Sequence, residues 1–393
     1  MFENYVRDNF EVVFTSKEKE KENSIENMLE FFKKRHWNSE WLGAKVDDIF
    51  LKIIPNGPLF VDEILNDYRL IVSEQAVEDT QEDSEGNGNG ASQFVIKFND
   101  KYYLLSNTAL DGIVNNFIGY GVASNFKKLK KIQQKEALEI FKNANPNKEL
   151  KLFYSAEKIR AIQSKKYEPM AQYDLINKLL EELKTKGKIE LVYGKYTHNN
   201  TILCFKILNQ ELIKEYVEAY NVHSLYRAKE IIPYINFNTS DVGSAAAKVI
   251  AGFIIDGDII TLGDIISIEH ISGNTIENFY QELPNLFVLY KAEMEKLISL
   301  FDIEIKHPIF AAKTYLEEVG FSDNVIKENL NSFISDDEEH KYNAHDLFVF
   351  ANILIDHLNA DGKISDTATI KIKENISRSI NKKNWDYLDK GAE

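Results

Sequence analysis

Residues 158–183 constrain the fold most, because this short stretch changes from an extended to a helical hydrophobic pattern. Isoleucines at 159 and 162 indicate a brief strand. Pro169 then disfavours helix at the residue before it, since its ring clashes with a preceding residue in helical conformation. Beyond the proline, apolar residues recur at helical spacing: Tyr173, Ile176, Leu179, Leu180 and Leu183. We therefore predict a strand, a basic and aromatic loop, and an amphipathic helix that ends near Gly187.

Chain length and composition are typical of a globular protein with a sizeable core. The chain has 393 residues, of which 44% are hydrophobic and 12% aromatic, so two domains, or one with extensions, are expected. Its only cysteine, Cys204, excludes an internal disulfide framework and a cysteine-rich zinc site. The N-terminus carries no signal-peptide pattern and no run of about 18 apolar residues suggests a membrane span. The expected location is the cytoplasm, of the host cell if the gene is carried by a phage.

The sequence divides into an N-terminal extension, a main domain and a helical C-terminal part. Residues 1–45 form the extension, in which Trp37 and Trp41 are expected to pack in a core. Residues 46–285 form the main domain, and its acidic, glycine-rich segment 74–93 is predicted to be a mobile loop. Residues 286–393 form a helical domain or appendage, with a polar end at 374–393 that is expected to fray.

Within the main domain, paired strands predict an α+β fold with a mostly antiparallel sheet and packed helices. Strand pairs are expected at 94–98 with 101–105, at 189–193 with 202–208, and around the Asp256-Gly257 turn. Ser106 is a predicted helix N-cap. Helices are expected at 285–301, 308–319, 323–333 and 344–358.

Three segments of the main domain resemble a known family. They read NDKYYLLSNTAL at 99–110, RAIQSKKYEPM at 160–170 and NTSDVGSAA at 238–246, and HISG at 270–273 fits more loosely. In their order over residues 46–280 they resemble the phage- and plasmid-borne family called domain of unknown function 932. The resemblance implies carriage on a phage, prophage or plasmid, and no particular chemistry.

Basic residues gather in two parts of a chain whose formal net charge is -15. Residues 125–140 predict a basic amphipathic helix with Phe126, Leu129 and Ile132 on its apolar face. We expect its lysines to meet the basic loop on a single face and bind single-stranded nucleic acid, with lysines on phosphates and tyrosines on bases. The alternative is that the lysines only solvate an acidic protein. The predicted interface consists of Lys127, Lys128, Lys130, Lys131, Arg160, Lys165, Lys166 and Tyr167.

Other chemistry is less well supported by the sequence. The acidic and histidine residues Asp256, Asp258, Asp264, Glu269 and His270 suit a divalent metal, although a turn and strand alternation explain them better. Residues 359–365 resemble a calcium loop, but aligning Gly362 leaves His357 and Ala368 where carboxylates are needed. No Walker A, dinucleotide-binding, nucleophile-elbow or H-E-x-x-H pattern occurs, and no cofactor is expected.

The sequence therefore predicts a non-enzymatic mobile-element protein that binds single-stranded nucleic acid in replication or recombination. One alternative is an acidic interaction protein that engages a host or defence factor. Another is a metal-dependent hydrolase or nuclease that uses the carboxylates at 256–270.

Overall fold

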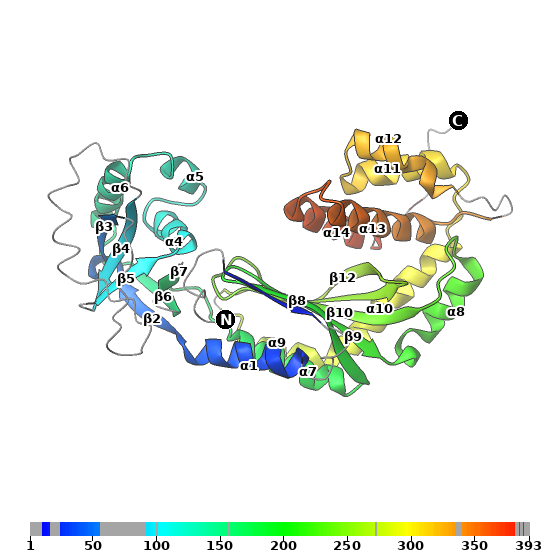
Figure 1. Ribbon diagram of the computed structural model, residues 1–393, viewed down its shortest axis with the longest axis horizontal. Helices are drawn as coiled ribbons and strands as arrows, with labels where there is room; N and C mark the ends of the chain where they lie inside the picture. Colours follow the sequence, from blue (N-terminus) through cyan, green and yellow to red (C-terminus); the bar gives the residue numbers. More distant parts are fainter. Residues whose placement is uncertain are drawn as a thin grey trace.

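The computed structural model describes residues 10–15, 24–55, 92–99, 101–155, 158–271, 273–334, 340–381, 385 and 388. The predicted α+β fold is confirmed, with two sheets rather than one. Figure 1 shows one sheet in the middle of the molecule, the other sheet with its helices at one end, and the C-terminal helices at the opposite end. The predicted loop at 74–93 lies outside the described residues, except that Ser92 and Gln93 begin a strand.

Sheet A, in the middle, is antiparallel throughout and has the order β1-β8-β9-β10-β11-β12. Asp256 and Gly257 both have positive φ in the turn between the last two strands, as a two-residue hairpin requires. The strands are β1 (Glu11–Thr15), β8 (Lys188–Thr197), β9 (Thr201–Leu208), β10 (Ile231–Thr239), β11 (Ala247–Ile255) and β12 (Asp258–Ile268).

Sheet B has the order β2-β6-β7-β5-β4-β3, and only its β5–β7 pair is parallel. Helix α4 lies directly on β7 because Gly112 has no side chain to meet the backbone of Ile162. Ser106 caps α4 as predicted, its Oγ accepting from the amide of Ala109 at 3.0 Å. The strands are β2 (Ser39–Lys45), β3 (Phe50–Pro55), β4 (Ser92–Phe98), β5 (Lys101–Leu105), β6 (Glu149–Ser155) and β7 (Lys158–Ser164).

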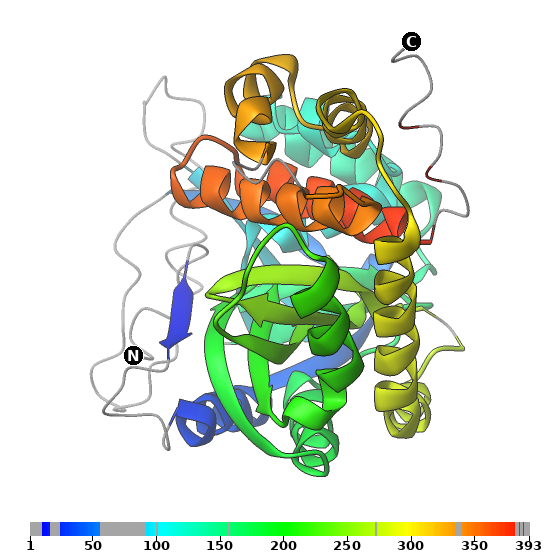
Figure 2. The ribbon, with the colours of Figure 1, turned by 90° about the vertical axis from the view of Figure 1, so that its right-hand side faces the viewer.

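The helices cover both sheets and fill the C-terminal region. Figure 2 shows α13 and α14, in orange, lying across sheet A, with α10, in yellow, along its side. The helices are α1 (Ser24–Trp37), α4 (Asn107–Phe117), α5 (Ala123–Phe126), α6 (Lys131–Ala144), α7 (Gln172–Lys184), α8 (Lys214–His223), α9 (Ile276–Glu282), α10 (Leu286–Ile298), α11 (Pro308–Val319), α12 (Asp323–Asn329), α13 (Ala344–Ala360) and α14 (Asp366–Ser379).

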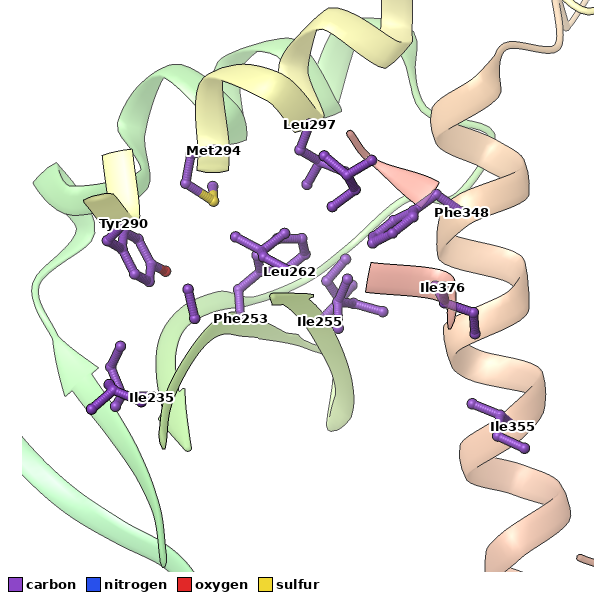
Figure 3. Close-up of a cluster of buried hydrophobic side chains, with 14 of the residues drawn as sticks. Ile235, Phe253, Ile255, Leu262, Tyr290, Met294, Leu297, Phe348, Ile355 and Ile376 are labelled. Atoms are coloured by element: carbon purple, nitrogen blue, oxygen red, sulfur yellow. The ribbon is translucent and has the colours of Figure 1, made fainter. Parts of the chain in front are cut away.

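The C-terminal helices share a hydrophobic core with sheet A. Figure 3 shows Phe253 and Leu262 of the sheet facing Met294 of α10 and Phe348 of α13. The segment expected to fray contributes to this core, because Ile376, Trp385 and Leu388 are buried. Trp385 packs against Tyr315 with ring centroids 5.3 Å apart. The scattered apolar residues of this polar segment therefore attach it to the hydrophobic core.

The N-terminal segment joins the two sheets. Strand β1 pairs with β8 in sheet A, helix α1 packs on α7, and β2 pairs with β6 in sheet B. Trp41 packs on Phe153 at 4.9 Å between ring centroids, as expected, whereas Trp37 is 70% exposed. The described residues before position 46 are therefore part of the folded body.

Candidate nucleic-acid interface

The residues predicted to bind nucleic acid separate into buried side chains and exposed lysines. Arg160 is 1% exposed, and its Nε lies 3.3 Å from the carbonyl oxygen of Ser155. Tyr167 is 6% exposed and donates from its hydroxyl to the carbonyl of Asp241 at 3.1 Å. Both side chains are buried, so neither is exposed for the predicted contact with a polynucleotide.

Sheet B separates the two groups of lysines. On β6, Leu150 and Leu152 face the core that α4 and α6 cover, whereas Phe153 packs on the opposite face with Trp41 and Val242. Because side chains alternate along a strand, Glu149 lies on the same face as Phe153. Lys165 forms an ion pair with Glu149 and so belongs to that face. The shared face expected for all the lysines is therefore not formed.

Residues 119–132, which we call the basic turn, comprise the connection that leads from α4 to α6 and the first two residues of α6. The single basic helix predicted at 125–140 is wrong, since α5 ends at Phe126 and Lys130 is extended, with φ -63° and ψ 150°. The Gln134 side chain explains the break: its Nε2 donates to the carbonyls of Phe126 and Leu129 at 3.1 and 2.9 Å. Gln133 accepts from the amide of Lys130 at 3.0 Å. These bonds end one helix and start the next.

The lysines of the basic turn crowd the N-terminal end of α6. Positive charge is unfavourable there, because the helix dipole already places partial positive charge at that end. Lys127 pairs with Asp111 at 2.7 Å, and both side chains are more than a third exposed. Burial lowers the pKa of Lys131, and the nearby charge of Lys127 lowers it further. An anion bound at this place would relieve the repulsion.

Tyr120 is the aromatic residue of the basic turn that the sequence reasoning missed. Its side chain is 81% exposed. Gly119 and Gly121 on either side have φ values of +139° and +83°, a conformation that other residues avoid. Leu129 and Ile132, predicted to lie on the apolar face of a helix, are 43% and 50% exposed. The Gly-Tyr-Gly sequence was the available signal, because two closely spaced glycines favour a turn and turns lie at the protein surface.

Two of the three segments that carry the family resemblance, and the looser fourth segment, meet between the sheets at what we call the junction: Arg35, Tyr167, Asp241 and His270. Tyr167 stacks on His270 with ring centroids 5.3 Å apart and planes 7° from parallel. Arg35 of α1 pairs with Asp241 and donates from Nε to the hydroxyl of Tyr196 at 2.6 Å. These contacts bring together residues 160–170, 238–246 and 270–273.

The junction is a buried polar network that fastens sheet B to sheet A. Arg35, Asp241 and His270 are each at most 6% exposed. Burial raises the pKa of Asp241, while the charge of Arg35 acts in the opposite direction. Burial lowers the pKa of His270, whose Nδ1 donates to the carbonyl of Glu168 at 3.2 Å. The geometry is that of a structural link in which the charges of Arg35 and Asp241 pair inside the protein.

The metal ligands suggested at 256–270 are spread along β12. Asp256 accepts from the amides of Lys229 and Glu230 at 2.9 Å, and Asp258 pairs with His357 at 3.3 Å. Glu269 and His270 follow the opposite end of this strand, roughly 33 Å away at about 3.3 Å per residue. Among the described residues, no group of three or more acidic, histidine or cysteine side chains is placed to hold a metal ion.

The calcium-like segment at 359–365 is the corner between α13 and α14. Gly362 has a φ of +67°, and the Oγ of Ser365 accepts from the amide of Ala368 at 3.3 Å as the cap of α14. The side chain of Asn359 accepts from Thr369 at 3.2 Å. These residues therefore stabilise the turn between α13 and α14.

Comparisons with known proteins do not identify a family for this chain. No protein-family model, curated protein or solved structure matches the chain. The resemblance carried by the three segments thus stays a prediction. In the part of the chain that the structure describes, no helix has both the length and the apolar composition to cross a membrane.

Proposed function

We propose that this protein binds single-stranded nucleic acid through the basic turn and catalyses no reaction on it. The observation that carries the proposal is the placement of the exposed Tyr120 on the same short connection as Lys127, Lys128, Lys130 and Lys131. A role in replication or recombination of a phage or plasmid, in the cytoplasm of the host cell, is part of the proposal and follows from the family resemblance.

The lysines supply the electrostatic part of such binding. Lysine ammonium groups neutralise phosphates and release condensed counterions, so affinity falls as salt concentration rises. The N-terminal end of α6 adds its dipole and its unpaired backbone amides to the same place. A phosphate there would also counter the repulsion that lowers the pKa of Lys131.

Tyr120 supplies the stacking interaction, which favours single-stranded over double-stranded nucleic acid. A base can stack on an exposed tyrosine ring only if it is free of its own duplex stack, and stacking is tolerant of sequence. Figure 1 shows α4 and α5 at the edge of their lobe that is turned toward the C-terminal helices. In the connection between these two helices, Tyr120 and Gly121 are exposed.

Fluorescence anisotropy with a labelled oligothymidine tests the proposal. We expect the Lys128→Glu/Lys130→Glu double variant to bind at least about tenfold more weakly at low salt and to show a flatter salt dependence. The matched control is Lys165→Glu/Lys166→Glu, which changes the net charge equally but lies away from the basic turn. No binding of the oligonucleotide at low salt would overturn the proposal, and so would an equal loss in both double variants.

A further inference from the structure

A pocket of about 360 Å³ lies between strands β9–β12 of sheet A and helix α14. Its volume is within the range of small-molecule sites, about 300–1,000 Å³. It is lined by polar side chains from both elements, together with Ile202 and Ile250 of the sheet. Neither the basic turn nor the junction contributes a lining residue, so the pocket is a separate feature of the molecule.

Two asparagines on β10 give this pocket its hydrogen-bonding character. Asn236 and Asn238 are alternate residues, so their side chains are on one face of the sheet, where Asn238 is opposite Ile202 and Lys248. The Oδ1 atoms of both asparagines are buried, and among the described groups neither has a hydrogen-bond partner. A buried acceptor without a donor is costly, so a ligand that donates to these oxygens is favoured.

The charged side chains that line the pocket are engaged in ion pairs. Lys373 pairs with Asp356 at 2.5 Å, and Arg378 and Lys248 approach Glu374 at 3.6 and 4.0 Å. A charged ligand would have to displace one of these pairs. A hydroxyl group can instead join them, since it accepts from an ammonium group and donates to a carboxylate.

The pocket leaves room for a partly apolar ring beside Gly263 of β12. Gly263 lines it, and a Cβ built there would meet no described atom within 4 Å. Ile202 and Ile250 offer apolar surface beside the two asparagines. Hydroxyl-binding edges around an apolar patch suit a ring with C–H groups on its face and hydroxyls on its rim.

We propose that this pocket binds an uncharged, polyhydroxylated ring, namely a sugar, either free or as the sugar of a nucleoside. The hydroxyls donate to Asn236 and Asn238, and the remaining hydroxyls join the ion pairs of α14. The proposal is independent of the basic turn, and its failure would leave nucleic-acid binding at the basic turn untouched.

Saturation-transfer difference NMR on the full chain tests this proposal, because it detects weak ligands directly. The probes are D-glucose, D-ribose and adenosine at millimolar concentration. We expect saturation transfer to at least one of them, and about tenfold weaker binding of that probe by Asn238→Ala, which removes one acceptor. Transfer to D-glucose indicates a free saccharide, and transfer to adenosine but to neither sugar indicates a nucleoside.

Two glycine variants locate the binding. Gly263→Leu is expected to fill the pocket and abolish the signal, whereas Gly43→Leu on β2, where a Cβ also meets no described atom within 4 Å, should leave it unchanged. Circular dichroism checks that each variant is folded. If Gly263→Leu does not fold, the affinity of Asn238→Ala for the probe tests the location of binding instead. Absence of transfer to all three probes would overturn the proposal, as would a signal that persists in Gly263→Leu or in Asn238→Ala.

Discussion

Tyr120 in the basic turn and Tyr167 in the junction both occur near cationic residues, but the first is 81% exposed and the second 6%. In the junction, Arg35 has a carboxylate partner, Asp241, and a hydroxyl partner, Tyr196. In the basic turn, Lys127 and Lys131 are close enough for one charge to lower the pKa of the other. The cation of the junction therefore has partners inside the protein, whereas the cations of the basic turn lie close to one another.

The difference between the two regions shows that a buried charged side chain needs a partner of opposite charge within the protein. A buried cation is stable only with a partner inside the protein, because desolvation removes its interaction with water. An exposed cation keeps its water and can instead meet an external anion. The junction therefore contributes to the fold, and the basic turn is the place to look for a ligand. Four experiments test this contrast.

The largest effect is expected from Arg35→Met, which leaves Asp241 buried without its cation. The free energy of unfolding should fall by about 3–5 kcal/mol, measured by urea denaturation. Arg378→Met, on an exposed side chain paired with Glu374, is the control and should change stability by less than about 1 kcal/mol. The double variant Arg35→Met/Asp241→Leu should recover part of the loss. Equal stability of Arg35→Met and wild type would mean that the junction does not fasten the sheets.

Tyr120→Ala is expected to weaken oligothymidine binding by about 1–3 kcal/mol, the range for stacking of one base on an aromatic side chain. Its thermal stability should not change, because the ring is mostly in solvent. The control is Trp37→Ala, another exposed aromatic side chain, with Lys33 Nζ 4.9 Å from its ring centroid but outside the basic turn. Loss of affinity in both variants alike would remove the special role of Tyr120.

The pH dependence of the free energy of unfolding should show whether His270 is buried in its neutral form. Its pKa is lowered by burial, so the folded protein binds this proton less readily than the unfolded chain. As pH falls through the unfolded value of about 6.5, the unfolded chain is protonated first and the folded state loses stability, by at most about 1.4 kcal/mol per pH unit. His270→Phe retains the aromatic ring and should show a shallower decline between neutral and mildly acidic pH. Parallel stability curves for the two proteins would contradict a buried neutral histidine.

The smallest effect is expected from Lys127→Met, which removes the exposed pair with Asp111. Stability should change by less than about 1 kcal/mol, since water screens the pair. The pKa of Lys131 should rise, because the repelling charge is gone. Carbon-detected NMR titration of lysine side chains measures this shift. A pKa of Lys131 that stays the same would show that burial alone lowers it.

Local patterns predicted most of the secondary structure. The helical spacing that ends at Leu183 is α7, the Asn99 and Asp256-Gly257 turns join strands, and Ser106 caps its helix. Each of these features depends on residues a few positions apart. Sequence alone therefore specifies them.

The candidate site was predicted only in part, for a related reason. Lys127, Lys128 and Lys130 are exposed and Lys131 is half-buried, but Gln134 breaks the helix that the apolar spacing suggested. The lysines at 165 and 166 are exposed too, yet Lys165 lies on the other face of sheet B. Alternation along a strand fixes which face a side chain takes, but the helices that cover each face come from elsewhere in the chain.

The sequence by itself determined the α+β class, the order of the main strands and helices, and where positive charge concentrates. Only the tertiary structure decided that Arg160 and Tyr167 are enclosed, that Tyr120 is presented, and that Arg35 meets Asp241 across 206 positions of the chain (241 minus 35). The physical reason is that exposure and charge pairing depend on contacts between distant segments. Those contacts arise only when the two sheets pack together.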